Sequence, residues 1–143
     1  MYRIQRFIAI VACAMFALLL GFPPALYSLG LKGVEGRPQK PLRLASAEQK
    51  TVAWKHARGE GIPYISADNP YSYVASVFLT QEQRTPASQL VTWWVARDYL
   101  LRHQRYKGMG WWHSSGAALA IWLSRNWTSD EIFSAAAQLR QSA

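Results

Sequence analysis

The residues that could do acid–base or metal chemistry are few in this sequence and stand far apart. Its three histidines, His56, His103 and His113, lie in separate segments, and no two of them form an HxH or HxxxH pair. A zinc site in a protein needs several such ligands at close spacing. The only cysteine, Cys13, lies inside an apolar run, so the chain offers neither a thiolate cluster nor an internal disulfide. The sequence therefore predicts no metal centre and no other cofactor.

Glu60 is the acid that stands in the setting most suggestive of catalysis. It lies between Gly59 and Gly61 at the end of an expected helix, and in this respect it resembles the catalytic Glu of lysozyme-like transglycosylases. Such a general acid needs apolar surroundings that raise its pKa, usually with a second carboxyl across the cleft. The next acid, Asp68, follows eight residues later. We therefore assign no catalytic residue, keep Glu60 as the candidate, and expect it to be a solvated turn residue.

The stretch LSRNWTSDEIF, from Leu123 to Phe133, resembles a segment of the membrane-anchored peptidoglycan glycosyltransferases. In that family one helix ends there and a Ser-Lys-Asp-Glu-Ile-Leu run begins the next. The similarity covers 11 of the 143 residues. The Glu-Asp-x-x-Phe-x-x-His motif that bears the family's catalytic acid, and its Gln-Gly-Gly-Ser-Thr run, have no counterpart in this sequence. The resemblance implies peptidoglycan chemistry as an alternative function but transfers no catalytic residue.

Two tryptophan pairs mark the best candidate for a binding surface. Adjacent residues of a helix point about 100° apart, so Trp93 and Trp94 cannot both face one core. Trp111 and Trp112 follow a Gly-Met-Gly break, where aromatic rings could form a platform for a sugar or a partner side chain. Basic residues stand close to both pairs. The predicted binding residues are Trp93, Trp94, Arg102, Arg105, Trp111, Trp112 and His113.

An apolar run from Phe7 to Leu31 precedes all of these residues. Its 25 positions contain no Lys, Arg, Asp, Glu or His. About 20 apolar residues in a helix cross a hydrocarbon core of about 30 Å, so the run predicts a transmembrane anchor. A cleaved signal is the alternative, but Pro, Leu and Tyr flank the candidate cleavage positions near Ala25 and Ser28, where a peptidase needs small residues. We therefore expect the run to be retained.

Charges on the two sides of this run compete in setting its orientation. Arg3 and Arg6, in the tail formed by residues 1–6, favour a cytoplasmic N-terminus. The Pro- and Gly-rich linker expected at residues 32–45 carries four basic residues and favours the reverse. Because the tail adjoins the apolar run as it does in a signal sequence, we expect a single-pass protein of the bacterial inner membrane with a periplasmic C-terminal domain.

Residues 46–143 carry helix signals and no alternating strand pattern longer than four residues. Capping boxes begin at Ser46 and Thr128, and N-cap residues followed by Pro stand at 69–70 and 85–86. The helix after 85–86 is expected to run to about residue 106, and Ser114 or Ser115 to cap a helix whose apolar middle is the most buried element. The predicted fold is all-α, with one N-terminal transmembrane helix followed by a small bundle of about five helices.

The formal charge of +8 and the seven Trp and seven Tyr residues favour a surface that binds other molecules. Anionic lipids or glycans suit this charge, whereas an exported domain is not expected to meet nucleic acid. Since no catalytic set is assembled, we expect an accessory or assembly protein that docks on an integral membrane or periplasmic partner of an envelope complex. The alternative is a peptidoglycan-acting enzyme, of the glycosyltransferase or lytic transglycosylase kind, or a glycan-binding module.

Overall fold

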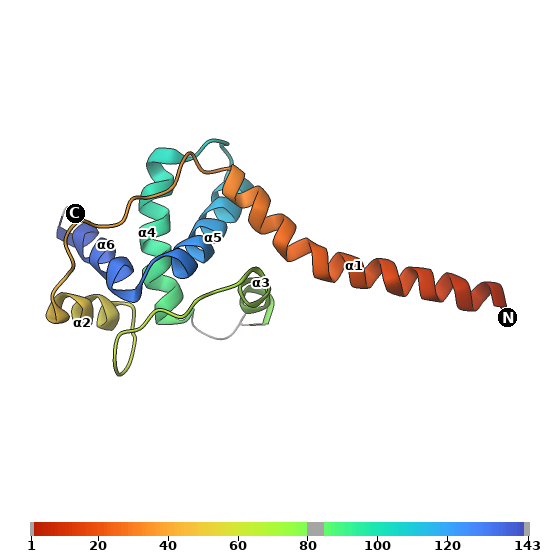
Figure 1. Cartoon of the computed structure of the whole chain (residues 1–143), viewed down its shortest axis with the longest axis horizontal. Coiled ribbons are helices and arrows are strands. Elements are labelled where there is room, and N and C mark those ends of the chain that lie inside the picture. The colour runs from red at the N-terminus through yellow and green to blue at the C-terminus, as the bar shows by residue number, and fades with distance from the viewer. Residues whose placement is uncertain (1, 80–84, 142–143) are drawn as a thin grey trace.

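The computed structural model is all-helical, with 72% of the chain in six helices, and it describes residues 2–79 and 85–141. One long apolar helix precedes a small helical bundle, so the predicted fold class is confirmed (Figure 1). The helices are α1 (Tyr2–Lys32), α2 (Ala47–His56), α3 (Pro70–Leu79), α4 (Ala87–His103), α5 (Met109–Asn126) and α6 (Ser129–Gln141).

α1 extends far from the bundle as a long arm, which bends between the part next to the bundle and the outer part (Figure 1). It is long and apolar enough to cross a membrane, and every residue from Arg3 to Phe22 is exposed. Pro23 is the first buried residue of the helix. The apolar run predicted from the sequence therefore has two parts: an outer part, as far as Phe22, in which every residue is exposed, and an inner part, from Pro23 onward, that packs on the bundle.

The change between these two parts coincides with a proline pair inside the helix. Proline has no backbone N–H, so Pro23 and Pro24 leave the carbonyls of Leu19 and Leu20 without their usual helical donors. The Tyr71 hydroxyl, at the start of α3, donates to the Leu20 carbonyl at 2.6 Å. This bond satisfies a carbonyl that the helix cannot satisfy itself, and it holds α3 against α1.

Two glycines let α1 approach α5 closely. A Cβ atom at Gly30 would lie 2.7 Å from the Ala118 Cβ, and one at Gly33 would collide with the Ser115 hydroxyl. Any larger residue would force the helices apart, as in the small-residue contacts of membrane helices. The chain then continues through Val34, which is 3% exposed, and the Glu35 N–H donates to the His103 carbonyl at 2.8 Å. The end of α1 therefore packs on α5, and the residues that follow it hydrogen-bond to the end of α4.

The predicted linker, residues 32–45, also lies against the bundle, between the end of α1 and the start of α2 (Figure 1). Lys40 pairs with Glu131 at 2.9 Å, and the Arg37 guanidinium lies 5.8 Å from the centroid of the Trp122 ring. The Ala45 N–H donates to the Ser134 hydroxyl at 2.7 Å. These contacts hold the segment on the domain.

Three of the predicted helix starts are confirmed. Ser46 and Thr128 form capping boxes, in which each hydroxyl accepts from the N–H three residues on and that residue's side chain accepts from the cap N–H. Asn69 caps α3 in the same way, with its Oδ1 accepting from the Ser72 N–H at 2.8 Å. These signals can be recognised in the sequence because each involves residues only three positions apart.

Two other predicted caps are wrong. α4 begins after Pro86 without a side-chain cap bond, so Thr85 does not cap it, and the helix ends at His103 rather than near residue 106. α5 begins at Met109 after Gly108, which has a φ of 118°. Ser114 and Ser115 therefore lie inside α5, where the Ser114 backbone lies against Gly30 of α1 and the Ser115 hydroxyl faces Gly33.

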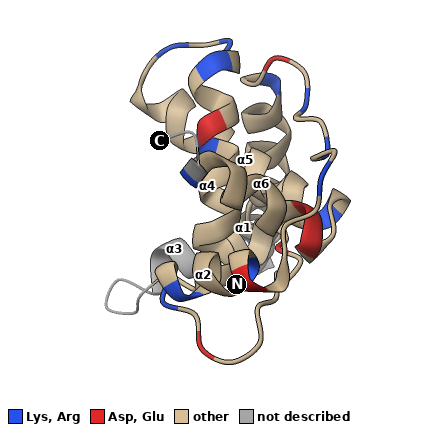
Figure 2. Cartoon of the chain, turned by 90° about the vertical axis from the view of Figure 1, so that its left-hand side faces the viewer, with Lys and Arg blue, Asp and Glu red and all other residues tan. Residues whose placement is uncertain are grey.

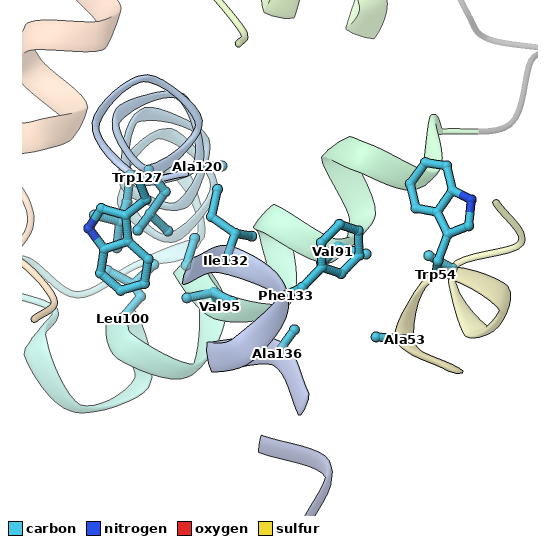
Figure 3. Packing of buried hydrophobic residues seen from close by; sticks show 14 of the residues in the cluster. Ala53, Trp54, Val91, Val95, Leu100, Ala120, Trp127, Ile132, Phe133 and Ala136 are labelled. Atoms are coloured by element: carbon cyan, nitrogen blue, oxygen red, sulfur yellow. The ribbon is translucent and has the colours of Figure 1, made fainter. Parts of the chain in front are cut away.

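The core lies between α2, α4, α5 and α6. In Figure 3, Phe133 packs between Val91 and Trp54, and the rings of Phe133 and Trp54 meet edge to face at 6.0 Å. α5 has eight buried residues, more than the six of α4, as its apolar middle predicts. Burial of large side chains such as Leu119, Leu123 and Ile132 supplies most of the stability of such a bundle.

Candidate binding sites

The predicted binding residues do not form one surface. Trp93 and Trp94 point to different places, as adjacent helical residues must. Trp93 is half-buried, and its ring lies so close to Gly116 that a Cβ there would be 2.5 Å from the nearest ring atom. Trp94 lies on another face of α4, with its ring 5.4 Å from that of His56. The two rings therefore belong to two separate sites.

Trp111 and Trp112 lie in the first turn of α5 and do not form an open platform. Both are half-buried. The Trp111 ring packs against Tyr106 at 4.7 Å and lies beside Gly33, while Trp112 packs against the core. Trp111 therefore helps to join α5 to the end of α1, and Trp112 adds to the core. His113 differs from them, because it is exposed and lines the same pocket as Trp93.

The basic residues near the tryptophans are also dispersed. Arg102 forms an ion pair with Asp98 one turn earlier, and Arg105 lies in the turn after α4, where its backbone N–H donates to the Gly33 carbonyl at 2.9 Å. In the view of Figure 2, Lys and Arg are spread along loops and helix ends and do not gather in one block. Charge alone therefore does not mark a single binding face.

Glu60 has an exposed side chain in the loop after α2. Its backbone carbonyl accepts a hydrogen bond from the Trp54 indole at 3.1 Å, so the backbone of Glu60, and not its carboxyl, helps to hold the Trp54 ring in place. The carboxyl lacks the apolar enclosure that a general acid of a glycosidase requires. Its position agrees with the solvated turn residue expected from the sequence.

Asp68, the acid that follows Glu60 in the sequence, is buried, and its sequence context did not predict this burial. It is 7% exposed in the loop before α3. Its N–H donates to the Ser124 hydroxyl at 3.0 Å, and the Gln89 amide donates to its carboxylate at 3.2 Å. Burial raises the pKa of Asp68, while the bond from Gln89 acts in the opposite direction. No local sequence motif indicates that Asp68 is buried, because its burial depends on packing with α4 and α5, which follow later in the chain.

A pocket of about 620 Å³ lies between α1, α3, α4 and α5. Its walls are mostly apolar and include Phe22 and Leu26 of α1, Val74 of α3, Leu90 and Trp93 of α4, and Ile121 of α5. Ligand pockets in proteins commonly have volumes of about 300–1,000 Å³ and a few polar groups on an apolar lining. This pocket fits that description.

Several polar residues line this pocket, among them Tyr27 of α1 and Thr85 just before α4. Gln89 of α4, His113 and Ser114 of α5, and Tyr73 of α3 all contribute to its lining. Burial raises the pKa of Tyr73, and the nearby negative charge of Asp68 raises it further. Because Gln89 also bonds to Asp68, a buried polar network adjoins an otherwise apolar pocket.

A second, shallower groove of about 320 Å³ lies between α4 and α6, beside the end of α2. Leu101, at its edge, is 64% exposed. The groove combines apolar and basic side chains and has one acid, Asp98, which already pairs with Arg102. We refer to it as the α4/α6 groove; its lining includes His56, Trp94, Arg97, Leu101, Leu139 and Arg140.

Within the described ranges, no three His, Cys, Asp or Glu side chains lie close enough to hold a metal ion. No family model matches the chain, and neither a curated protein nor a solved structure matches it. The long apolar helix α1, the pocket and the α4/α6 groove are therefore the features from which a function can be inferred.

Proposed function

We propose that the protein is an accessory or assembly protein of a bacterial envelope complex, anchored in the inner membrane by α1, with its helical domain in the periplasm. The observation that carries this proposal is the way α1 enters the domain. The exposed apolar arm and the packed part are one continuous helix, fixed to α5 at Gly30 and Gly33 and to α3 through Tyr71. A domain mounted in this way keeps a fixed height and orientation above the membrane.

Fixed orientation suits a protein that presents one face to a neighbouring membrane complex. α1 packs on α5 and α3, and α6, which lines the α4/α6 groove together with α4, lies on the side of the domain away from α1 (Figure 1). The groove therefore stays accessible when α1 is in a bilayer. Its exposed Leu101 and the half-buried Trp94 are apolar anchors of the kind that dominate protein interfaces.

The charges of the groove indicate the chemistry of the partner. Arg97 and Arg140 line the groove together with apolar side chains, and its one acid, Asp98, is already paired with Arg102. We therefore propose that the groove binds an amphipathic helix with apolar and acidic residues, contributed by an integral membrane or periplasmic protein. Complementary charges of this kind increase the rate of encounter and fix the register of docking.

Photo-crosslinking in intact cells tests this proposal. A benzophenone amino acid at Leu101 should give a discrete cross-linked species, whereas the same probe at Ile62, an exposed loop residue 85% accessible, should not. Absence of any cross-linked species from position 101 would contradict the proposal.

A matched pair of substitutions then measures the contribution of the groove. Leu101→Asp introduces an acid into a basic groove, while Leu42→Asp makes the same change at a fully exposed leucine elsewhere. Leu101→Asp should weaken partner capture by about 2 kcal/mol, close to a thirtyfold loss, and Leu42→Asp should have little effect. Equal retention of the partner by both variants, with helices intact by circular dichroism, would refute the assignment of the groove.

A further inference from the structure

The pocket between α1, α3, α4 and α5 lies at the depth where α1 would leave the bilayer. A hydrocarbon core of about 30 Å takes about 20 helical residues. Counted from Phe7, the first residue after the charged Arg6, these residues end at Leu26. Leu26 lines the pocket, as does Phe22 one turn before it. The wall that α1 contributes thus lies in the last turn of the hydrocarbon layer.

An apolar stripe connects this wall with the lipid-facing surface of α1. Met15, Leu18, Phe22 and Leu26 follow one another at intervals of three, four and four residues, which places them on one face of the helix. All four are exposed, with Phe22 at 50% and Leu26 at 36%. The last two belong both to the outer surface of α1 and to the pocket. The pocket is therefore continuous with the surface that lipid chains would cover.

α3 lies at the same depth. Tyr71 bonds to the Leu20 carbonyl, which places the start of α3 beside the outer part of α1. The sequence of α3, PYSYVASVFL, contains no charged residue, so this helix can enter the edge of the bilayer without burying a charge. The outer leaflet then surrounds two of the four helices that form the pocket.

We propose that this pocket holds one acyl chain of a phospholipid from the leaflet next to the domain. A chain that moves from the bilayer into the pocket keeps its apolar surroundings, and it covers apolar walls that would otherwise stand empty or meet water. Gln89, His113 and Ser114 place hydrogen-bonding groups in the pocket wall, where the ester and glycerol groups of the lipid could pair with them. This inference needs α1 to span the membrane, but it does not depend on the α4/α6 groove or its partner.

Photolabelling of the full chain in lipid vesicles tests the proposal. The probe is a phosphatidylethanolamine that carries a diazirine near the end of one acyl chain, mixed into vesicles of phosphatidylethanolamine and phosphatidylglycerol. Label should appear on peptides of α4 and α5 that contain Leu90, Trp93 and Ile121, in addition to the exposed arm of α1. Label confined to α1 would overturn the proposal.

Two Ala→Phe variants provide the control. Ala117 lines the pocket, so Ala117→Phe fills it, whereas Ala25 is exposed on α1 and does not line it. Ala117→Phe should reduce labelling of the α4 and α5 peptides at least fivefold and leave labelling of α1 unchanged, and Ala25→Phe should change neither. Unchanged α4 and α5 labelling in Ala117→Phe would also contradict the proposal. If Ala117→Phe fails to fold, Ala117→Leu and the wild-type labelling pattern still decide the question.

Flotation of the protein with the vesicles separates this inference from the anchor on which it rests. A protein that floats but shows no label on α4 or α5 retains its anchor and lacks the lipid site. A protein that does not float contradicts both.

Discussion

Replacing Gly30 by Ala tests whether α1 is fixed to the domain by close packing on α5. A Cβ at this position would lie 2.7 Å from the Ala118 Cβ and closer still to the Ser114 backbone carbonyl. Both obstacles belong to the helix backbone or are attached directly to it, so no side chain can rotate away. The two helices must therefore move apart.

Gly21→Ala is the matched control for this change. Gly21 lies in the same helix, and a Cβ there would meet nothing within 4 Å. Ala favours a helix over Gly by up to about 1 kcal/mol, and this gain applies to both positions. It therefore cancels in the comparison, and the difference between the two variants measures the packing of α1 on α5.

Overpacking of a close contact typically costs about 1–3 kcal/mol. For a small domain this corresponds to a melting temperature roughly 5–20 °C lower in Gly30→Ala than in Gly21→Ala. Thermal unfolding of the two full-length variants in the same detergent, followed by circular dichroism, gives this difference. Equal melting temperatures would refute the conclusion that α1 is mounted rigidly through this contact.

Three further substitutions have definite expected outcomes. The buried Ser115 hydroxyl has no hydrogen-bond partner within the described residues, so Ser115→Ala should raise the free energy of unfolding by about 1 kcal/mol; a loss of stability in denaturant titrations would reveal a partner. Burial raises the pKa of Asp68 above its ordinary 3.8, so the folded state binds this proton more tightly than the unfolded chain and the ionised form costs stability. Asp68→Asn should therefore be at least as stable as the wild type near pH 7, with the difference shrinking as the pH falls toward 3.8, and a variant clearly less stable near pH 7 would contradict this account. Glu60→Gln should leave the cellular phenotype unchanged, because an exposed substitution usually changes stability by less than about 0.5 kcal/mol; a phenotype equal to that of a deletion would instead support the peptidoglycan-enzyme alternative.

The parts of the fold that could be predicted from the sequence are those encoded by near neighbours. The capping boxes at Ser46 and Thr128 each use residues three positions apart, and the apolar middle of α5 is visible in its composition. The Ser114-Ser115 pair has the same local appearance as a cap, but its role is set by α1, more than 80 residues earlier in the sequence, whose Gly30 and Gly33 need small partners. A single sequence gives no sign of that pairing.

The binding sites were harder to predict for the same reason. The angle between adjacent helical residues indicated that Trp93 and Trp94 face different ways, but not that one belongs to a pocket and the other to a groove. The burial of Asp68 could not be predicted, because a loop acid becomes buried only when α4 and α5 pack over it. The pocket itself is formed by four helices. For one of them, α1, the sequence predicted a membrane anchor but no part in a pocket.

Accessibility of two engineered cysteines to a membrane-impermeant maleimide tests the proposed anchor and orientation most directly. Cys13, the native cysteine, is first replaced by Ser, and a single cysteine is placed at Lys107, in the exposed loop before α5, or at Arg3, before the apolar run. In spheroplasts of a Gram-negative host, the cysteine at position 107 should react at once, and the cysteine at position 3 only after lysis. Reaction at position 3 and protection at position 107 would place the domain in the cytoplasm, and a mature chain that lacks position 3 would show that the apolar run is a cleaved signal.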